Sequence, residues 1–164
     1  IGKGSRSRQI RYRIQDEYLH FYHAFIRAHQ REILSGRFSP GQVFHGRVYL
    51  QWQGYAFERL CRRQAALIAD RLRFSGIEYQ SGSWFEPARS GSSGTQVDLL
   101  FERKDRMLTV CEAKYSHGVQ AGTLIRDFEA RCDALRRRFP RHGIQKVLIL
   151  GKAGPIPEKV KRYF

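Results

Sequence analysis

The chain has few acids, few cysteines and no long apolar run. Asp and Glu total 15 against 30 Lys and Arg, so the formal net charge of the 164 residues is +15. No segment approaches the roughly 20 consecutive apolar residues of a membrane-spanning helix, and no signal peptide is visible. These absences predict a cytoplasmic protein whose chain does not enter a membrane.

The cysteines are too few and too widely spaced to stabilise the fold by disulfide bonds. Cys61, Cys111 and Cys132 are odd in number, far apart and without a Cys-x-x-Cys pair. This spacing argues against a disulfide framework and against a zinc knuckle. All three lie in apolar patterns, so we expect buried, reduced thiols. The histidines show no metal-ligand spacing combined with acids.

The basic residues are clustered, which suggests a polyanionic partner. Residues 1–13 contain Lys and Arg but no acid. One further cluster shares a predicted helix, and another crowds the end of a second predicted helix: Arg62, Arg63, Arg71 and Arg73, and Arg131, Arg136, Arg137, Arg138 and Arg141. Nucleic acid is the leading candidate and an anionic membrane surface is the alternative. Part of the last cluster would also complement a helix dipole.

The hydrophobic pattern predicts an α/β fold in which helices cover a small mixed sheet. The length suffices for one domain, or for one domain with an appendage. The expected elements are a strand at 10–14, a helix with an aromatic face after the N-cap Asp16, a linker at 35–41, a helix at 54–73, a strand at 77–85, a hairpin at 97–114, a helix at 118–139, a strand at 146–150 and a short helix at 158–164. Glu58 falls in the first turn of the helix at 54–73, where an acid is favourable electrostatically.

The hairpin carries three charges at positions that should be buried. Asp98 lies in one apolar run, and Glu112 and Lys114 lie in the next. A turn centred on Asp105 would pair residues whose numbers sum to 210, which places Asp98 opposite Glu112. Opposed residues share a face, with their Cβ atoms about 4.5–5.5 Å apart. A slip of one residue in the turn, or a β-bulge, would change that face.

Two carboxylates this close repel unless a positive charge lies between them. Lys114 is one candidate for that charge, and a hard divalent cation is the other. In the first case the three residues form a salt-bridged cluster with a structural role. In the second case they form a metal site.

The order of elements, with an acid followed by Glu-x-Lys on a central hairpin, resembles the PD-(D/E)xK nuclease superfamily, the restriction-endonuclease-like fold. The resemblance covers roughly residues 50–152. Asp98 matches the family's Asp, Glu112 and Lys114 match its (D/E)xK, and Glu58 matches an acid often found on the first core helix. The family's leading proline is absent.

A narrower resemblance extends to the C-terminal region of prokaryotic AAA-type ATPases, carried by residues 12–21 and 54–60. In those proteins a winged-helix domain precedes a nuclease-like domain. The resemblance implies that residues 1–40 are the end of a winged-helix domain and a linking helix, and that residues 41–164 are the nuclease-like domain. The chain begins with Ile1 and has no Walker A pattern. We therefore expect a fragment whose partner is the ATPase domain of the full-length chain.

The resemblance to nucleases implies a Mg²⁺- or Mn²⁺-dependent phosphodiesterase that acts on DNA. Asp98, Glu112 and Glu58 would ligate the metal, and Lys114 would orient the attacking water or stabilise developing charge. Residues expected to hold the phosphate backbone are Arg62, Arg63, Arg136, Arg137 and Arg138.

Two other functions fit the same residues. The domain could be a catalytically silent DNA-binding or regulatory module that docks on its ATPase, or a toxin-like RNase with the same site chemistry. A membrane is not expected as a partner, and a homo-oligomer is left open. Metal-dependent cleavage separates the enzyme from the binding module.

Overall fold

The chain forms two compact units of different architecture. The structure is a computed structural model, and it describes residues 14, 16–87, 94–115, 121–151 and 156–164. The division falls between a helical unit, Gly2–Ala56, and an α/β unit, Phe57–Phe164. The predicted strand at 10–14, apart from Ile14, and the basic cluster at 1–13 lie outside the described residues.

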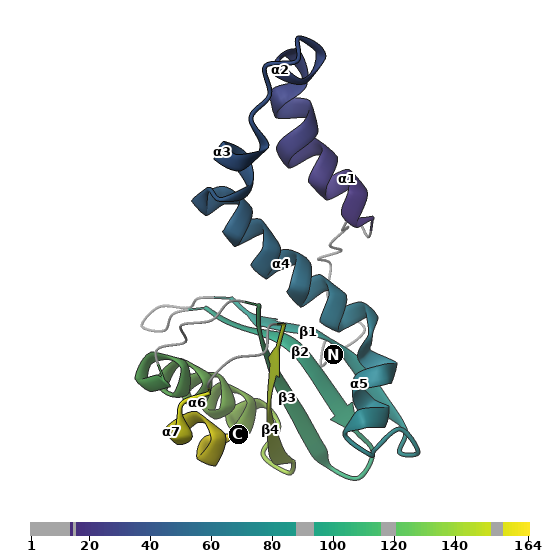
Figure 1. The fold of residues 1–164 in the computed structure, drawn as a ribbon. Helices are drawn as coiled ribbons and strands as arrows, with labels where there is room; N and C mark the ends of the chain where they lie inside the picture. The colour runs from purple at the N-terminus through teal and green to yellow at the C-terminus, as the bar shows by residue number, and fades with distance from the viewer. Residues whose placement is uncertain (1–13, 15, 88–93, 116–120, 152–155) are drawn as a thin grey trace. The chain divides into compact units, whose positions relative to one another are not determined.

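The described elements are mostly those expected, with shifted ends (Figure 1). The helical unit contains α1 (Glu17–Phe21), a π-helical turn (Tyr22–Ile26), a 3₁₀ turn (Arg27–His29), α2 (Gln30–Leu34), α3 (Pro40–Phe44) and the start of α4 (Arg47–Arg63). The α/β unit continues with α5 (Ala65–Arg71), β1 (Tyr79–Glu86), β2 (Thr95–Arg103), β3 (Met107–Lys114), α6 (Ala121–Arg138), β4 (Gly143–Leu150) and α7 (Glu158–Tyr163). No described helix has the length and apolar character needed to cross a membrane.

The four strands form one mixed sheet in the order β1-β2-β3-β4. β1, β2 and β3 pair antiparallel, and β3 pairs with β4 in parallel. A parallel pair needs a long crossover, and α6 provides it. The prediction of an α/β fold with a small mixed sheet flanked by helices is confirmed.

The predicted register of the hairpin is confirmed from Leu99–Cys111 to Glu102–Leu108, and the expected pair of Asp98 with Glu112 is not among the regular pairs. Leu99 pairs with Cys111 and Leu100 with Val110, so the residue numbers sum to 210. The turn is held by the side chain of Asp105, whose Oδ1 accepts a hydrogen bond from the N–H of Met107 at 3.2 Å. A side-chain bond of this kind is typical of Asp in tight turns. Local turn chemistry therefore sets which residues oppose each other.

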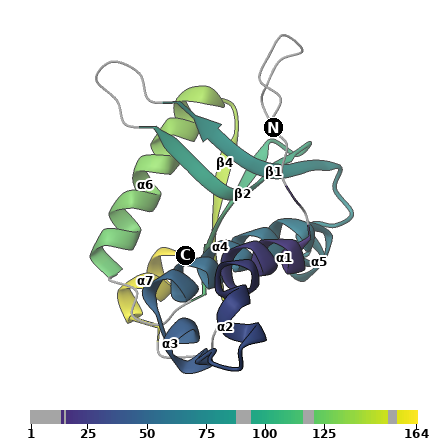
Figure 2. The same ribbon diagram turned by 90° about the horizontal axis from the view of Figure 1, so that it is seen from above.

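Helices cover both faces of the sheet, as Figure 2 shows for α6 on one side and α5 on the other. Against α6, the apolar cluster consists of Trp84, Val97, Leu100, Leu108, Val110, Phe128, Cys132, Ala134 and Leu135. Against α5 and the end of α4, it consists of Cys61, Ala65, Ala69, Phe74, Leu99, Phe101, Cys111 and Ala113. Strands covered on both faces carry apolar residues at successive positions, which explains the nearly continuous apolar runs of β2 and β3.

The helix expected at 54–73 differs from the observed one at its start and in its middle. α4 begins at Arg47, and the helical run is interrupted at Gln64 before α5. The early start follows from Gly46, whose carbonyl accepts hydrogen bonds from the N–H groups of Tyr49 (3.1 Å) and Leu50 (3.2 Å). Gly54 therefore lies inside α4, and Glu58 lies in its later part. The explanation of Glu58 as a favourable first-turn acid is wrong.

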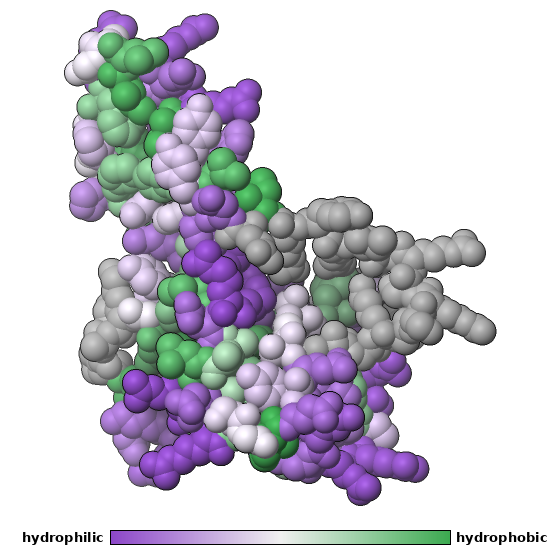
Figure 3. All heavy atoms as spheres, turned by 90° about the vertical axis from the view of Figure 1, so that its right-hand side faces the viewer, coloured by the Kyte–Doolittle hydropathy of each residue, from purple (hydrophilic) through white to green (hydrophobic). Residues whose placement is uncertain are grey.

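The helical unit is held by aromatic packing. Asp16 caps α1 as predicted, since its Oδ1 accepts hydrogen bonds from the N–H groups of Tyr18 (2.8 Å) and Leu19 (3.2 Å). Phe25 packs edge-on against Trp52, with ring centroids 5.6 Å apart. Among the described residues of this unit Phe25 alone is buried, and Figure 3 shows hydrophobic residues beside hydrophilic ones on the unit's surface.

The C-terminal helix α7 is fastened to α6 and β4 by an acidic side chain. Glu129 of α6 accepts hydrogen bonds from the hydroxyl of Tyr163 and from the ammonium of Lys146, the latter at 3.1 Å. The phenol, Arg136 and Lys146 together lower the pKa of Glu129 to about 2. The pairing therefore favours the ionised carboxylate and ties three elements of the α/β unit together.

Candidate functional site

Asp98 stands at a β-bulge in β2. Between two regular pairs, β1 contributes one residue, Ser83, where β2 contributes two, Asp98 and Leu99. The residues on either side of the bulge, Val97 and Leu100, both pack into the cluster against α6. The alternation of faces is thus interrupted at Asp98. Bulges bend a strand and re-aim its side chains, and they are frequent beside active sites.

The Asp98 carboxylate bonds to the neighbouring strand rather than to solvent. Its Oδ2 accepts a hydrogen bond from the N–H of Ala113 at 3.2 Å, and the residue is 8% exposed. The regular ladder between β2 and β3 is paired up to Leu99 and Cys111. The Asp98 carboxylate therefore contacts β3 at Ala113, the residue between Glu112 and Lys114. This contact lies at the end of the hairpin for which the site was predicted.

Glu112 is buried between two cations. It is 2% exposed, and its Oε1 lies 2.8 Å from the ammonium of Lys114. Its Oε2 accepts a hydrogen bond from the guanidinium of Arg131 on α6. A buried carboxylate is tolerated only when it is paired in this way. The pairing with Lys114 is the one foreseen from the sequence, and the pairing with Arg131 is additional.

Glu58 reaches the same place from α4. The guanidinium of Arg62 lies 4.0 Å from Glu58 and donates a hydrogen bond at 3.2 Å to the backbone carbonyl of Asp98. Burial, the charge of Asp98 and, more weakly, that of Glu112 raise the pKa of Glu58 to about 7. Arg62 thus links Glu58 to the backbone of Asp98, whose carboxylate in turn bonds to the N–H of Ala113, between Glu112 and Lys114 in sequence. The four residues predicted for the site are therefore neighbours connected through these contacts, and their charges influence the ionisation of Glu58.

The cluster is electrically balanced by the protein's own residues. The acids Glu58, Asp98 and Glu112 are matched by the bases Arg62, Lys114 and Arg131. The raised pKa of Glu58 shows that the balance is incomplete at its own position, where burial and neighbouring negative charge still dominate. A cation or a proton placed near Glu58 would relieve that repulsion.

The acids suit a hard divalent cation by their chemistry. Carboxylate oxygens are the ligands that Mg²⁺ prefers, and each oxygen of Glu112 keeps a lone pair beyond its present hydrogen bond. In the part of the chain that the structure describes, however, no three His, Cys, Asp or Glu side chains are arranged to hold a metal ion. Binding a cation would require the acids to re-orient from the positions described here.

The predicted phosphate-binding arginines differ in exposure. Arg62 is half-buried and lies beside Glu58, whereas Arg63 in the last turn of α4 and Arg136, Arg137 and Arg138 in the last turn of α6 are exposed. Arg136 also pairs with Glu129 (2.8 Å) and Asp133 (2.7 Å). The basic end of α6 also complements its dipole, as the sequence suggested.

Arg131 is the site residue that the sequence analysis did not select. Its helical spacing was the available signal, because it lies three residues after Phe128 and four before Leu135, both of which are buried on the inner side of α6. An arginine on an apolar stripe requires a buried acceptor. Glu112 is that acceptor.

The three cysteines are buried and free, as predicted. Burial, followed by the charge of Asp98, raises the pKa of Cys61 to about 11. A thiol with such a pKa is a poor nucleophile at neutral pH. Cys61 therefore serves as apolar packing beside the site.

No protein-family model, no curated protein and no solved structure matches this chain.

Proposed function

We propose that the α/β unit is a metal-dependent phosphodiesterase that acts on DNA, built on a restriction-endonuclease-like core and working as the C-terminal module of an ATPase. One observation carries the proposal. Glu58, Asp98, Glu112 and Lys114 arrive from three separate elements at one end of the β2–β3 hairpin. Asp98 and Glu112 are buried and Glu58 is half-buried. Burial of acids costs stability, and a group of such acids beside a lysine is typical of a functional cluster.

The residues would divide the work by their chemistry. Asp98, Glu112 and Glu58 would hold Mg²⁺ or Mn²⁺, which lowers the pKa of a bound water and neutralises charge on the phosphate. The ammonium of Lys114, 39% exposed, is available to a phosphate oxygen while its partner Glu112 stays buried. Arg63 and its exposed counterparts on α6 would contact the nucleic-acid backbone without reading sequence.

Cleavage assays with matched variants test this proposal. The purified chain should cut linear DNA in Mg²⁺ or Mn²⁺ and not in EDTA. Asp98→Asn and Lys114→Met should each reduce the rate by at least about 100-fold, as for loss of a metal ligand or of an electrostatic catalyst. Lys104→Met is the control for the lysine change, since Lys104 is 71% exposed in the β2–β3 turn. Cleavage that survives both site substitutions would contradict the assignment.

The charge balance of the cluster favours a second function, a catalytically silent DNA-binding or regulatory module. Glu112 is already neutralised by Lys114 and Arg131, which is the salt-bridged arrangement. Such a module would retard DNA with a steep dependence on salt and would never cut it. An RNA substrate in the same assay separates DNA from RNA cleavage. Binding without cleavage under every metal condition would establish this second function in place of the first.

A further inference from the structure

The strand β4 forms an edge of the described sheet, and its outer backbone groups have no strand partner among the residues that the structure describes. β4 pairs with β3 and stands last in the strand order. The N–H groups of Gly143 and Gly151 donate to the carbonyls of Arg106 and Lys114, each at 2.9 Å. Odd-numbered residues of β4 therefore direct their backbone groups toward β3. Because direction alternates along a strand, even-numbered residues direct theirs away from the sheet.

Four residues consequently present N–H and C=O groups at the free edge: Ile144, Lys146, Leu148 and Leu150. No hydrogen bond joins these four N–H groups to another described residue. An edge of this kind is a template for pairing with a further strand, and proteins usually protect it with charge, proline or a covering element. In β4 all four residues that follow Lys146 are apolar.

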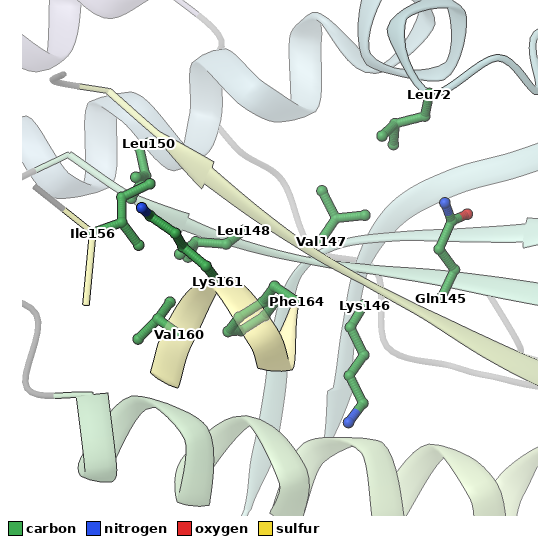
Figure 4. Close-up of a pocket in the computed structure, with 10 residues that line it drawn as sticks. All are labelled: Leu72, Gln145, Lys146, Val147, Leu148, Leu150, Ile156, Val160, Lys161 and Phe164. Carbon is green, nitrogen blue, oxygen red and sulfur yellow. The ribbon is translucent and has the colours of Figure 1, made fainter. Parts of the chain in front are cut away.

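A hollow of about 390 Å³ follows this edge (Figure 4). Leu72 lies on one side of β4, and residues of α7 and the segment before it lie on the other (Figure 4). On the α7 side the wall includes Val160 and Phe164, and the strand itself contributes Val147 and Leu148. The hollow therefore flanks the strand with apolar surface on both faces of the sheet.

This arrangement suits an added strand better than a compact ligand. The side chains of an extended peptide alternate between two faces with a period of two residues. At the β4 edge one set would meet Leu72 and Val147, and the other set would meet Leu148 and the α7 wall. The lining residues of β4 run from Gln145 to Leu150, a span of about 16 Å, which matches a strand of five or six residues.

Charge selects the kind of peptide. Among the described residues, the charged side chains that line the hollow are Lys146 and Lys161, and none of the lining residues is an acid. Lys146 is held by Glu129 at 3.1 Å. Lys161, 56% exposed, lies 3.7 Å from the carboxylate of Glu158, and an exposed pair of this length is weak enough for an acidic ligand to compete for the ammonium. The net charge of +15 opposes a second copy of this chain in the same position.

We propose that the β4 edge binds an extended peptide segment of a partner protein as a fifth strand, and that this segment alternates apolar and acidic residues. Backbone hydrogen bonds to the even-numbered residues of β4 supply affinity, and the apolar walls with Lys161 supply selectivity. The proposal is independent of the chemistry at Asp98 and Glu112, since the hollow and the acid cluster share no residue.

Amide hydrogen exchange followed by NMR tests the pairing directly. The probe is a synthetic heptapeptide of alternating Val and Glu, added to the whole chain. Without it, the amides of Lys146, Leu148 and Leu150 should exchange fast, and those of Val147 and Ile149 slowly. With it, the first set should become protected and the second should not change. A peptide N-methylated on the amides that face β4 should give no protection. The proposal would be overturned if the N-methylated peptide protected these amides equally well, or if neither peptide protected them.

Charge reversal tests the chosen occupant by fluorescence anisotropy. Lys161→Glu should weaken binding of the Val-Glu peptide by about five- to thirtyfold, as expected when a surface ion pair becomes a repulsion. The same variant should strengthen binding of a Val-Lys peptide. Lys159→Glu is the matched control, because Lys159 is exposed on α7 but does not line the hollow. Equal affinity for both peptides, or self-association of the chain that protects these β4 amides without peptide, would contradict an acidic partner.

Discussion

Replacing Glu58 with glutamine should stabilise the α/β unit above neutral pH and have little effect in acid. The pKa of Glu58 rises from 4.5 to about 7 on folding, so the native state holds this proton more tightly than the unfolded chain. Stability therefore falls as pH rises from 4.5 to about 7, and the cost is fully present above that range. The shift corresponds to roughly 3 kcal/mol.

The net shift already contains the attraction of Arg62, whose guanidinium lies 4.0 Å from Glu58 between side chains that are 18% and 21% exposed. Losing this long pair therefore needs no separate correction. We expect the free energy of unfolding at about pH 8 to increase by up to roughly 3 kcal/mol.

Urea unfolding across pH measures this effect. The chain has 2 Trp, and in a Trp52→Phe background the fluorescence of buried Trp84 reports on the α/β unit alone. Glu78→Gln is the control, since Glu78 is 78% exposed, and it should leave stability unchanged. An equal gain for Glu58→Gln at acid and alkaline pH, or no gain above pH 7, would refute the electrostatic reasoning.

Three further perturbations probe the rest of the α/β unit. Arg131→Gln should lower the free energy of unfolding by about 2 kcal/mol because it leaves Glu112 with one cation. The same variant should bind Mn²⁺ more tightly. An unchanged Mn²⁺ affinity in calorimetric titration would argue that Arg131 does not compete with a metal. Glu129→Gln should release α7. In the wild-type protein the attachment of α7 should weaken as pH falls from 4.5 toward 2, because the carboxylate with its lowered pKa stabilises the fold only while it is ionised. Limited proteolysis near Tyr163 measures both effects, and identical cleavage of the variant and the wild-type protein would contradict this role. Arg137→Ala should reduce the slope of log affinity for DNA against log salt by about 1, and an unchanged slope in filter binding would remove this residue from the interface.

Much of the core architecture follows from local signals. The hairpin could be predicted because Asp105 caps its own turn, and a turn of known centre decides every pair on both strands. The buried cysteines followed from apolar surroundings. The mixed sheet followed from a hairpin, a helix and one more apolar strand in sequence. These features depend on residues that are neighbours along the chain.

Features that depend on distant residues were not accessible in the same way. The first turns of α4 pack on aromatic residues from earlier in the helical unit, as in the edge-on contact of Phe25 with Tyr49, whose ring centroids are 5.5 Å apart. The bulge at Asp98 arises from pairing with β1, for which the sequence contains no local signal. Arg131 becomes a site residue only because α6 crosses the sheet above Glu112.

The sequence by itself determined which residues oppose each other on the hairpin and that charge must be neutralised there, because a turn and its alternation are short-range properties. Tertiary structure alone decided what neutralises that charge. Arg62 and Arg131 reach the acids from helices on opposite faces of the sheet, and burial between those helices shifts the ionisation of Glu58. Burial and electrostatic coupling depend on three-dimensional distance, which spacing along a chain does not contain.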